Sequence, residues 1–277
     1  MQGGVNPPFL NLGNLMFYRS TSYIFLLEVK MMVNKSYKHW MIVFLMCCLA
    51  ASSIGLCTNA IGVFYTPVSK SLHVLKGTFA MHATLSTLTT ALTSLKMSKI
   101  IKKYNYKKIL LIGSLLSSIS TWMMSYSQSV YSFYILGVLR GIGVGIGGMV
   151  PITVIITNWF DEKYGLATSL ALSFSGLAGA IFSPLLSSWI TCYGWQMTYR
   201  LMAICIFILV FPVLIVPWKI NPQEENLLPY GYQERKDTIK IQDKKISLIT
   251  ISFLCMCLFT LLHTSITGIS QHLSCIA

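Results

Sequence analysis

The sequence predicts an all-α integral membrane protein, and three observations support this. Hydrophobic residues make up 54% of its 277 residues and charged residues only 10%, whereas a soluble domain averages about 25% charged residues. The apolar residues gather in continuous runs of about the 20 residues that a helix needs to cross a bilayer. A membrane β-barrel would instead alternate apolar and polar residues over segments of about ten. The lysines lie in short connections between these runs, so the net charge of +13 reflects membrane topology and does not indicate nucleic-acid binding.

Seven apolar runs qualify as membrane-spanning helices. They cover residues 40–65, 79–95, 109–126, 132–159, 166–190, 197–218 and 246–273. Residues 1–39 precede them as a cytoplasmic extension, which lacks the basic start and cleavage site of a secretory signal. We expect residues 1–30 to be disordered or not normally translated. The predicted organisation is a six-helix bundle at 40–218, a polar cytoplasmic linker at 219–245 and a seventh helix at 246–277, where the sequence ends. The linker is long for a helix connection, and this layout is typical of half a larger transporter.

The distribution of basic residues predicts which helix ends face the cytoplasm. Cytoplasmic loops carry an excess of lysine and arginine. The loop between the second and third runs holds six lysines, and the linker after the sixth run holds six basic residues. The first loop on the opposite side carries only Lys70 and Lys76. We therefore expect the N-terminus and the linker to be cytoplasmic.

Arg140 is the most informative residue, because it puts a charge in the middle of the fourth apolar run. It lies nine residues past Tyr131, about 13 Å into the membrane at 1.5 Å per residue. A charge at that depth costs several kcal/mol, so it normally faces the protein interior and marks a pathway. No Asp or Glu falls inside the other apolar runs. The pattern indicates an anionic ligand or a carboxylate outside this sequence; the alternative is a structural arginine that bonds helix carbonyls.

Small residues mark the faces of two helices. Gly137, Gly141 and Gly145 recur every four residues in the fourth run, a spacing that lets two helices approach closely. Gly176 in the fifth run precedes Pro184, which favours a kink. These positions predict close packing, a hinge for rocking, or both.

Polar residues in the first two runs are weaker candidates. Asn59 lies in the outer third of the first run, and a buried amide is costly without a partner. We therefore expect it to face the bundle, in a substrate-binding, gating or structural role. The second run is rich in hydroxyls, which line a wet path or bond to their own helix. They are Thr84, Ser86, Thr87, Thr89, Thr90, Thr93 and Ser94.

Enzymatic chemistry and metal binding find no support in the sequence. It has no phosphate-binding loop, nucleophile elbow, zinc-protease sequence or paired carboxylates. Its eight cysteines lack zinc-like spacing. We expect no cofactor. The lysines between residues 96 and 108 set topology, and they also suit anionic lipid headgroups.

Three features resemble the N-terminal half of a major facilitator superfamily transporter. Residues 98–108 are similar to the signature loop of this family, and the surroundings of Arg140 resemble its arginine-and-glycine sequence in the fourth span. Asn158-Trp-Phe-Asp-Glu-Lys-Tyr-Gly-Leu-Ala with Tyr193-Gly-Trp resembles the monocarboxylate and oxalate/formate antiporter branch. Asn221-Pro-Gln-Glu-Glu, Pro229-Tyr-Gly and Gln271-His-Leu point to the same branch.

The resemblance implies a twelve-helix transporter of the plasma membrane, of which this chain would hold six helices, as two three-helix repeats, and a seventh. It implies transport of a small mono- or dicarboxylate by alternating access, with Arg140 and Asn59 as substrate-binding residues. The partner would be a missing C-terminal half or a second copy. The gating loop would carry Lys99, Lys102, Lys103, Lys107 and Lys108.

The chain departs from the family at two positions and in length. Ser98 and Lys102 stand where the loop usually carries Gly and Asp, so Asp161 and Glu162 are candidates for a reversed charge pairing. Because seven spans fall short of twelve, the alternative reading is a nonfunctional fragment or a structural or receptor-like membrane protein.

Overall fold

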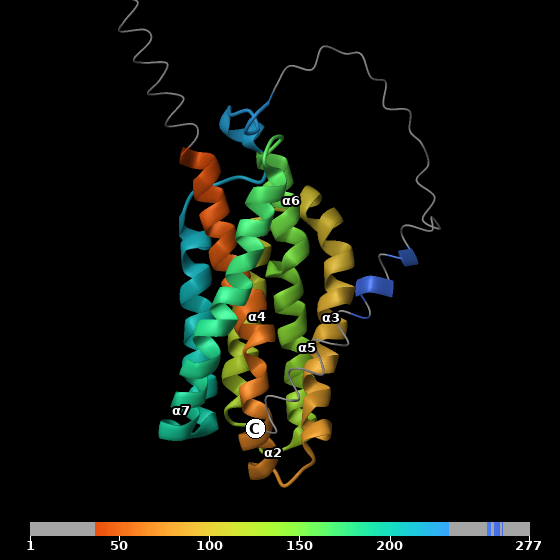
Figure 1. The fold of residues 1–277 in the computed structure, drawn as a ribbon, viewed down its shortest axis with the longest axis vertical. Coiled ribbons are helices and arrows are strands. Elements are labelled where there is room, and N and C mark those ends of the chain that lie inside the picture. The colour runs from red at the N-terminus through yellow and green to blue at the C-terminus, as the bar shows by residue number, and fades with distance from the viewer. Residues whose placement is uncertain (1–36, 233–253, 256–257, 261, 263–277) are drawn as a thin grey trace, which may run out of the picture.

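The computed structural model describes residues 37–232, apart from the side chain of Lys102, and residues 254–255, 258–260 and 262. Figure 1 shows a bundle of long helices that run up and down along one axis. Within this part the only strand-like pairing is an isolated bridge between Phe160 and Tyr230. The predicted N-terminal extension and most of the predicted seventh helix lie outside the described residues. The all-helical prediction is confirmed; the division into a six-helix bundle, linker and seventh helix stays a prediction.

Six helical segments follow the apolar runs. The first is Tyr37–Ser71, which contains the π-helix η1 (Ala51–Asn59), the 3₁₀-helix η2 (Ile61–Phe64) and α2 (Tyr65–Ser71). The others are α3 (Lys76–Lys103), α4 (Tyr106–Met124), α5 with α6 (Val130–Gly147 and Met149–Trp159), and the two parts of α7 (Tyr164–Ile215). Within the described residues, three helical stretches are long and apolar enough to cross a membrane. They are Tyr37–Ser71, Val130–Trp159 and Tyr164–Ile215.

The first segment departs from the uniform α-helix that its apolar run predicts. In η1 the backbone widens, and the Ala60 amide donates to the carbonyl of Gly55, 3.1 Å away. The chain then tightens into η2 before α2 begins. Pro67 in the first turn of α2 has no N–H, so the carbonyl of Val63, four residues earlier, lacks that helical partner. π-Helical turns inside α-helices occur frequently at functional sites.

The fourth run is divided in two. Gly148 leaves the helical region with φ −87° and ψ −156°, between α5 and α6. The glycine-rich sequence before it holds a helix weakly, and the ring of Pro151 clashes with the carbonyl of residue 147 in a continuous helix. The single span expected at 132–159 is therefore a broken one.

The fifth and sixth runs form α7, which is broken at Gly194. A straight helix of 52 residues would extend about 78 Å, far beyond the roughly 30 Å of a hydrocarbon core. Gly194 has φ 80° and ψ 164°, a conformation that residues with a Cβ avoid. The chain reverses there, so the two parts of α7 run back along each other in Figure 1.

The buried apolar residues form two clusters, one toward each end of the bundle. The cluster near the start of the first segment holds residues such as Ile42, Trp159 and Val213. The other is rich in aromatic residues and includes Leu136 and Val144 of α5. Arg140 lies on α5 between these last two residues, so its charge sits within an apolar core.

Candidate functional site

Arg140 is a buried charge with almost no hydrogen-bonding partner. Its side chain is 1% exposed. Nη1 lies 3.9 Å from Sδ of Met124, a weak acceptor, and Nε has no partner among the described residues. The acidic residues of the described part all lie at the far end of the bundle, in the α6–α7 connection and just after α7. They are Asp161, Glu162, Glu224 and Glu225. The guanidinium therefore has no carboxylate partner within this part of the chain.

A small polar cavity, the Arg140 cavity, adjoins this guanidinium. Its volume is about 140 Å³, and the first segment, α3 and α5 supply its walls. Its polar lining residues besides Arg140 are Cys57, Thr58, Tyr65, Ser86, Thr87 and Thr90. Because a water molecule takes about 30 Å³ of liquid volume, the cavity has room for a few waters or for a small carboxylate.

Two more buried polar atoms near Arg140 have no hydrogen-bonding partner in the part of the chain that the structure describes. They are the hydroxyl of Tyr199 and Nε2 of His82. The charge of Arg140 interacts electrostatically with both residues and with Cys57. Nδ1 of His82 bonds to the carbonyl of Phe79, so in a neutral ring Nε2 is an acceptor. Unsatisfied buried polar groups are rare and need an explanation such as an absent ligand or water.

The glycines of α5 lie against α3. An added Cβ at Gly137 would lie 2.6 Å from the carbonyl oxygen of His82, and one at Gly145 would lie 2.7 Å from Cβ of Thr93. Thr90 donates to the carbonyl of Gly141 at 2.9 Å. Two hydroxyls of α3, those of Thr87 and Thr90, both line the cavity and donate to helix carbonyls. Close packing on α3 fixes the position from which Arg140 projects.

Asn59 lies apart from the Arg140 cavity. It is exposed, and its Nδ2 donates to the carbonyl of Ser175 in α7 at 3.1 Å. An added Cβ at Gly176 would meet nothing within 4 Å, so Gly176 makes no close helix contact. The close contact between α7 and the first segment is made instead by Ala178 and Gly179, which face Gly55 and Asn59. The roles predicted for Asn59 and Gly176, and the hinge at the exposed Pro184, stay predictions.

The lysines of the predicted gating loop separate into two groups. Lys103 and Lys107 line a second cavity, the lysine cavity, of about 800 Å³ at the opposite end of the bundle. Lys99 and Lys108 are exposed and lie outside its lining. The side chain of Lys102 lies outside the described residues.

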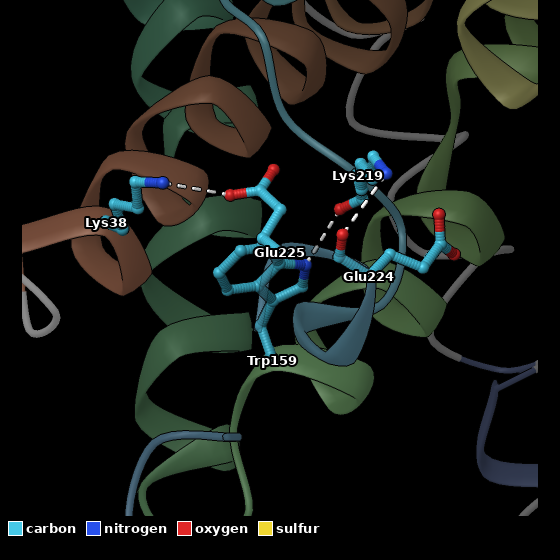
Figure 2. Close-up of polar contacts among 5 residues, drawn as sticks. All are labelled: Lys38, Trp159, Lys219, Glu224 and Glu225. Atoms are coloured by element: carbon cyan, nitrogen blue, oxygen red, sulfur yellow. Dashed lines mark hydrogen bonds and ion pairs between the residues drawn. The ribbon is translucent and has the colours of Figure 1, made fainter. Parts of the chain in front are cut away.

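The chain after α7 folds back over this end, and we call residues 216–232 the return segment. Figure 2 shows Trp159 Nε1 donating to the carbonyl of Lys219 at 3.0 Å and Lys219 Nζ donating to the carbonyl of Glu224 at 3.1 Å. The ion pair drawn there joins Lys38 and Glu225, 3.1 Å apart. The sequence suggested Asp161 and Glu162 for a charge pairing at this end. Their backbone N–H groups donate to the carbonyl of Tyr230, and the charge pairing of their side chains stays a prediction.

Sequence reasoning missed the part of the Arg140 cavity that the first segment supplies. Cys57, Thr58 and Tyr65 were not candidates, because their approach to Arg140 depends on η1 and η2 and therefore on tertiary packing. The hydroxyls of α3 were readable as a group. Their positions in the sequence alone did not tell which of them reach the cavity.

Comparison with known proteins places the chain in context. The family model of the Major Facilitator Superfamily matches residues 47–275. An uncharacterized transporter of this superfamily from Bacillus subtilis, YcxA, is 26% identical over 168 residues, which cover 60% of this chain and 41% of that protein. Monocarboxylate transporter 3 of Gallus gallus is 25% identical over 148 residues, or 52% of this chain and 27% of that protein. The riboflavin transporter RibJ of Trypanosoma cruzi is 33% identical over 76 residues, or 27% and 16%.

These matches fix the family and leave the substrate open. The aligned regions span less than half the length of each of these relatives. The family model covers more than half of this chain and includes both α5 with Arg140 and the whole of α7. The resemblance read from the sequence is thereby confirmed: the chain belongs to the major facilitator superfamily.

Proposed function

We propose that this chain supplies one bundle of a secondary transporter that carries a small organic anion, a mono- or dicarboxylate, across the membrane. The observation that carries the proposal is the guanidinium of Arg140, which is 1% exposed, borders a polar cavity and has an unpartnered Nε. The name of monocarboxylate transporter 3, a relative of this chain, supports the same class of substrate.

A carboxylate is the ligand that best completes this site. The planar guanidinium binds a carboxylate through two parallel hydrogen bonds, and the interaction is strong in a low-dielectric interior. Thr87 and Thr90 border the same cavity, but their hydroxyls already donate to the carbonyls of Ala83 and Gly141, so the free donors offered to a carboxylate are those of Arg140. Binding an anion would offset the cost of burying an unpaired cation.

The broken helices support transport by alternating access. In such transporters two bundles rock around a site near the midplane, which discontinuous helices often form. Here η1 contributes Cys57 and Thr58 to the Arg140 cavity, and α5 gives way to α6 at Gly148. The second bundle, or a second copy of this chain, would close the other side. Basic residues gather at the end of the bundle that the return segment covers, which favours a cytoplasmic N-terminus. The membrane that we propose is the plasma membrane.

The test is equilibrium binding of radiolabelled pyruvate and oxalate to the purified 277-residue chain in nanodiscs. We expect saturable binding that Arg140→Gln weakens at least 100-fold. Arg140→Lys should weaken it about tenfold, because lysine keeps the charge but loses the planar fork. The matched control is Arg200→Gln, since Arg200 has partners of its own: Nε lies 3.2 Å from the Ser125 hydroxyl, and the guanidinium lies 4.6 Å from the Tyr126 ring.

Two results would count against the proposal. Affinity that is unchanged in Arg140→Gln at a matched yield of folded protein would make the arginine structural. A wild-type chain that binds neither anion, alone or with a complementary bundle, would favour the structural or receptor-like alternative.

A further inference from the structure

The lysine cavity is large and is built from four separate parts of the chain. It has a volume of about 800 Å³ and lies where the end of α3, the start of α4, the end of α6 and the return segment meet. Three lysines border it: Lys103, Lys107 and Lys219. The positive-inside rule explains why lysines are common at this end. It does not explain why three of them, from α3, α4 and the return segment, surround one cavity.

Two of these lysines are held in place with hydrogen-bonding capacity to spare. Lys107 Nζ donates to the carbonyl of Val216 at 2.6 Å and lies 5.4 Å from the Trp218 ring. Lys219 Nζ donates to the carbonyl of Glu224 at 3.1 Å. An ammonium has three donors, so each of these contacts leaves two donors for a ligand.

The two acidic residues of the wall are already occupied. Glu225 pairs with Lys38 at 3.1 Å (Figure 2), and Lys38 does not line the cavity. The carboxylate of Glu224 accepts a hydrogen bond from Asn221 Nδ2 at 3.1 Å. Glu225 also interacts electrostatically with Lys107, so three lysines of the wall face two carboxylates, one of which is shared with Lys38. The excess of positive charge attracts an anion.

One exposed aromatic residue beside the cavity suits the level of lipid headgroups. Tyr104 is 55% exposed, whereas Tyr106 and Trp218 are buried in the cavity wall. Tryptophan and tyrosine concentrate where membrane meets water. Basic pockets between helices at this depth suit anionic headgroups.

We propose that the lysine cavity is a phosphate-binding site and that the headgroup of an anionic phospholipid fills it. Lys107 and Lys219 bind the phosphate oxygens, and Lys103 adds long-range attraction. The ligand chemistry is a phosphodiester anion, which a soluble phosphate ester shares. Such a lipid would join α3, α4 and α6 to the return segment at a place remote from Arg140.

The experiment measures lipid retention by native mass spectrometry of the full chain in neutral detergent. Phosphatidylglycerol is titrated against phosphatidylcholine of the same acyl composition. We expect phosphatidylglycerol to bind at least tenfold more tightly. Each lysine near a membrane surface contributes about fivefold, so the double variant Lys107→Gln/Lys219→Gln should lose about 25-fold.

The matched control is Lys99→Gln/Lys108→Gln, which removes the same charge at the same end from outside the cavity. It should lose less than threefold. Because Lys107→Gln also removes the bond to Val216, the charge-conserving Lys107→Arg variant should retain phosphatidylglycerol binding and checks that the fold persists. Equal losses in the two double variants would overturn the site in favour of diffuse surface charge.

A soluble source is distinguished by competition. Glycerophosphoglycerol and inorganic phosphate carry the phosphate without acyl chains. They should compete only at concentrations above about 10 mM, because without acyl chains they make no apolar contacts beside the cavity. Displacement of the lipid by equimolar glycerophosphoglycerol would overturn the lipid as occupant. Equal affinity for phosphatidylcholine would overturn the site altogether.

Discussion

The return segment and the surroundings of Arg140 differ in whether their charged groups have partners. At the return segment, Lys38 pairs with Glu225 at 3.1 Å and Lys219 donates to a carbonyl at 3.1 Å. In the aromatic core, the nearest hydrogen-bonding contact of Arg140 is a thioether 3.9 Å away, and its Nε has no partner among the described residues. Charge is satisfied where water is near and left unsatisfied where it is most costly.

The difference shows which charges serve the fold. A paired charge at a membrane surface adds a little to stability and can be replaced. An unpaired charge in an apolar interior lowers stability, so its presence requires another benefit. Binding a substrate anion is such a benefit, and the two regions therefore predict opposite responses to the removal of a charge.

The largest effect on stability is expected for Arg140→Met. Methionine fills a similar volume without a charge, so the free energy of unfolding should rise by about 1–3 kcal/mol. Denaturant titration of the purified chain in mixed micelles measures it. The control is Arg200→Met, which loses the contacts with Ser125 and Tyr126 and should be neutral or slightly destabilising. A clear loss of stability in Arg140→Met would mean that Arg140 has structural partners and that the contrast between the regions is false.

The next effect tests whether the surroundings of Arg140 are firmly packed. An added Cβ at Gly141 would overlap the hydroxyl of Thr89 and the carbonyl of Ser86. Gly141→Ala should therefore destabilise the chain by about 2 kcal/mol, the range for overpacking a core. The control Gly176→Ala enters open space and should stabilise the chain by up to about 1 kcal/mol, since alanine favours a helix. Similar changes in the free energy of unfolding of the two variants would show that the helices around Arg140 are loosely packed. The unpaired donors of Arg140 would then need no ligand.

The helices themselves were readable from the sequence because their cause is local. Continuous apolar runs cannot satisfy their backbone in a bilayer except as helices, and the runs before 219 each became helical. The breaks were not all readable. Gly194 lies in an expected turn, whereas Gly148 interrupts a run that shows no polar gap.

Of the candidate site, only the inward position of Arg140 could be predicted from the sequence. The cost of an exposed charge in lipid is enough to predict that Arg140 turns inward. Asn59 was expected to face the bundle because an unpartnered amide is costly in lipid, and it lies exposed after η1. A π-turn holds more residues than an α-turn, so the residues after it rotate away from the face that a regular helix would give them. Such a departure depends on packing against α7, which no local pattern records.

At the return segment, the removal of a partnered group should lower stability. Trp159→Phe keeps the buried ring but loses the bond from Nε1 to the Lys219 carbonyl at 3.0 Å. The expected loss is about 1 kcal/mol, the usual value for one hydrogen bond. The control is Trp189→Phe on α7, whose ring is partly buried. Equal stability of Trp159→Phe and wild type would show that the return segment is held by apolar contacts alone.

The smallest effect is expected for the ion pair, and it marks the other limit of the comparison. The Lys38 side chain is 46% exposed and that of Glu225 is 14% exposed, so water screens much of their attraction. A double-mutant cycle of Lys38→Gln and Glu225→Gln should give a coupling of about 0.5 kcal/mol, within the range of exposed pairs. It should nearly vanish in 1 M salt, where the screening length is about 3 Å. The response of Arg140 variants should change little with salt, because that side chain is only 1% exposed. A coupling above about 2 kcal/mol that persists in high salt would instead make the ion pair a buried structural element, and the partnered charge would then matter to the fold as much as the core does.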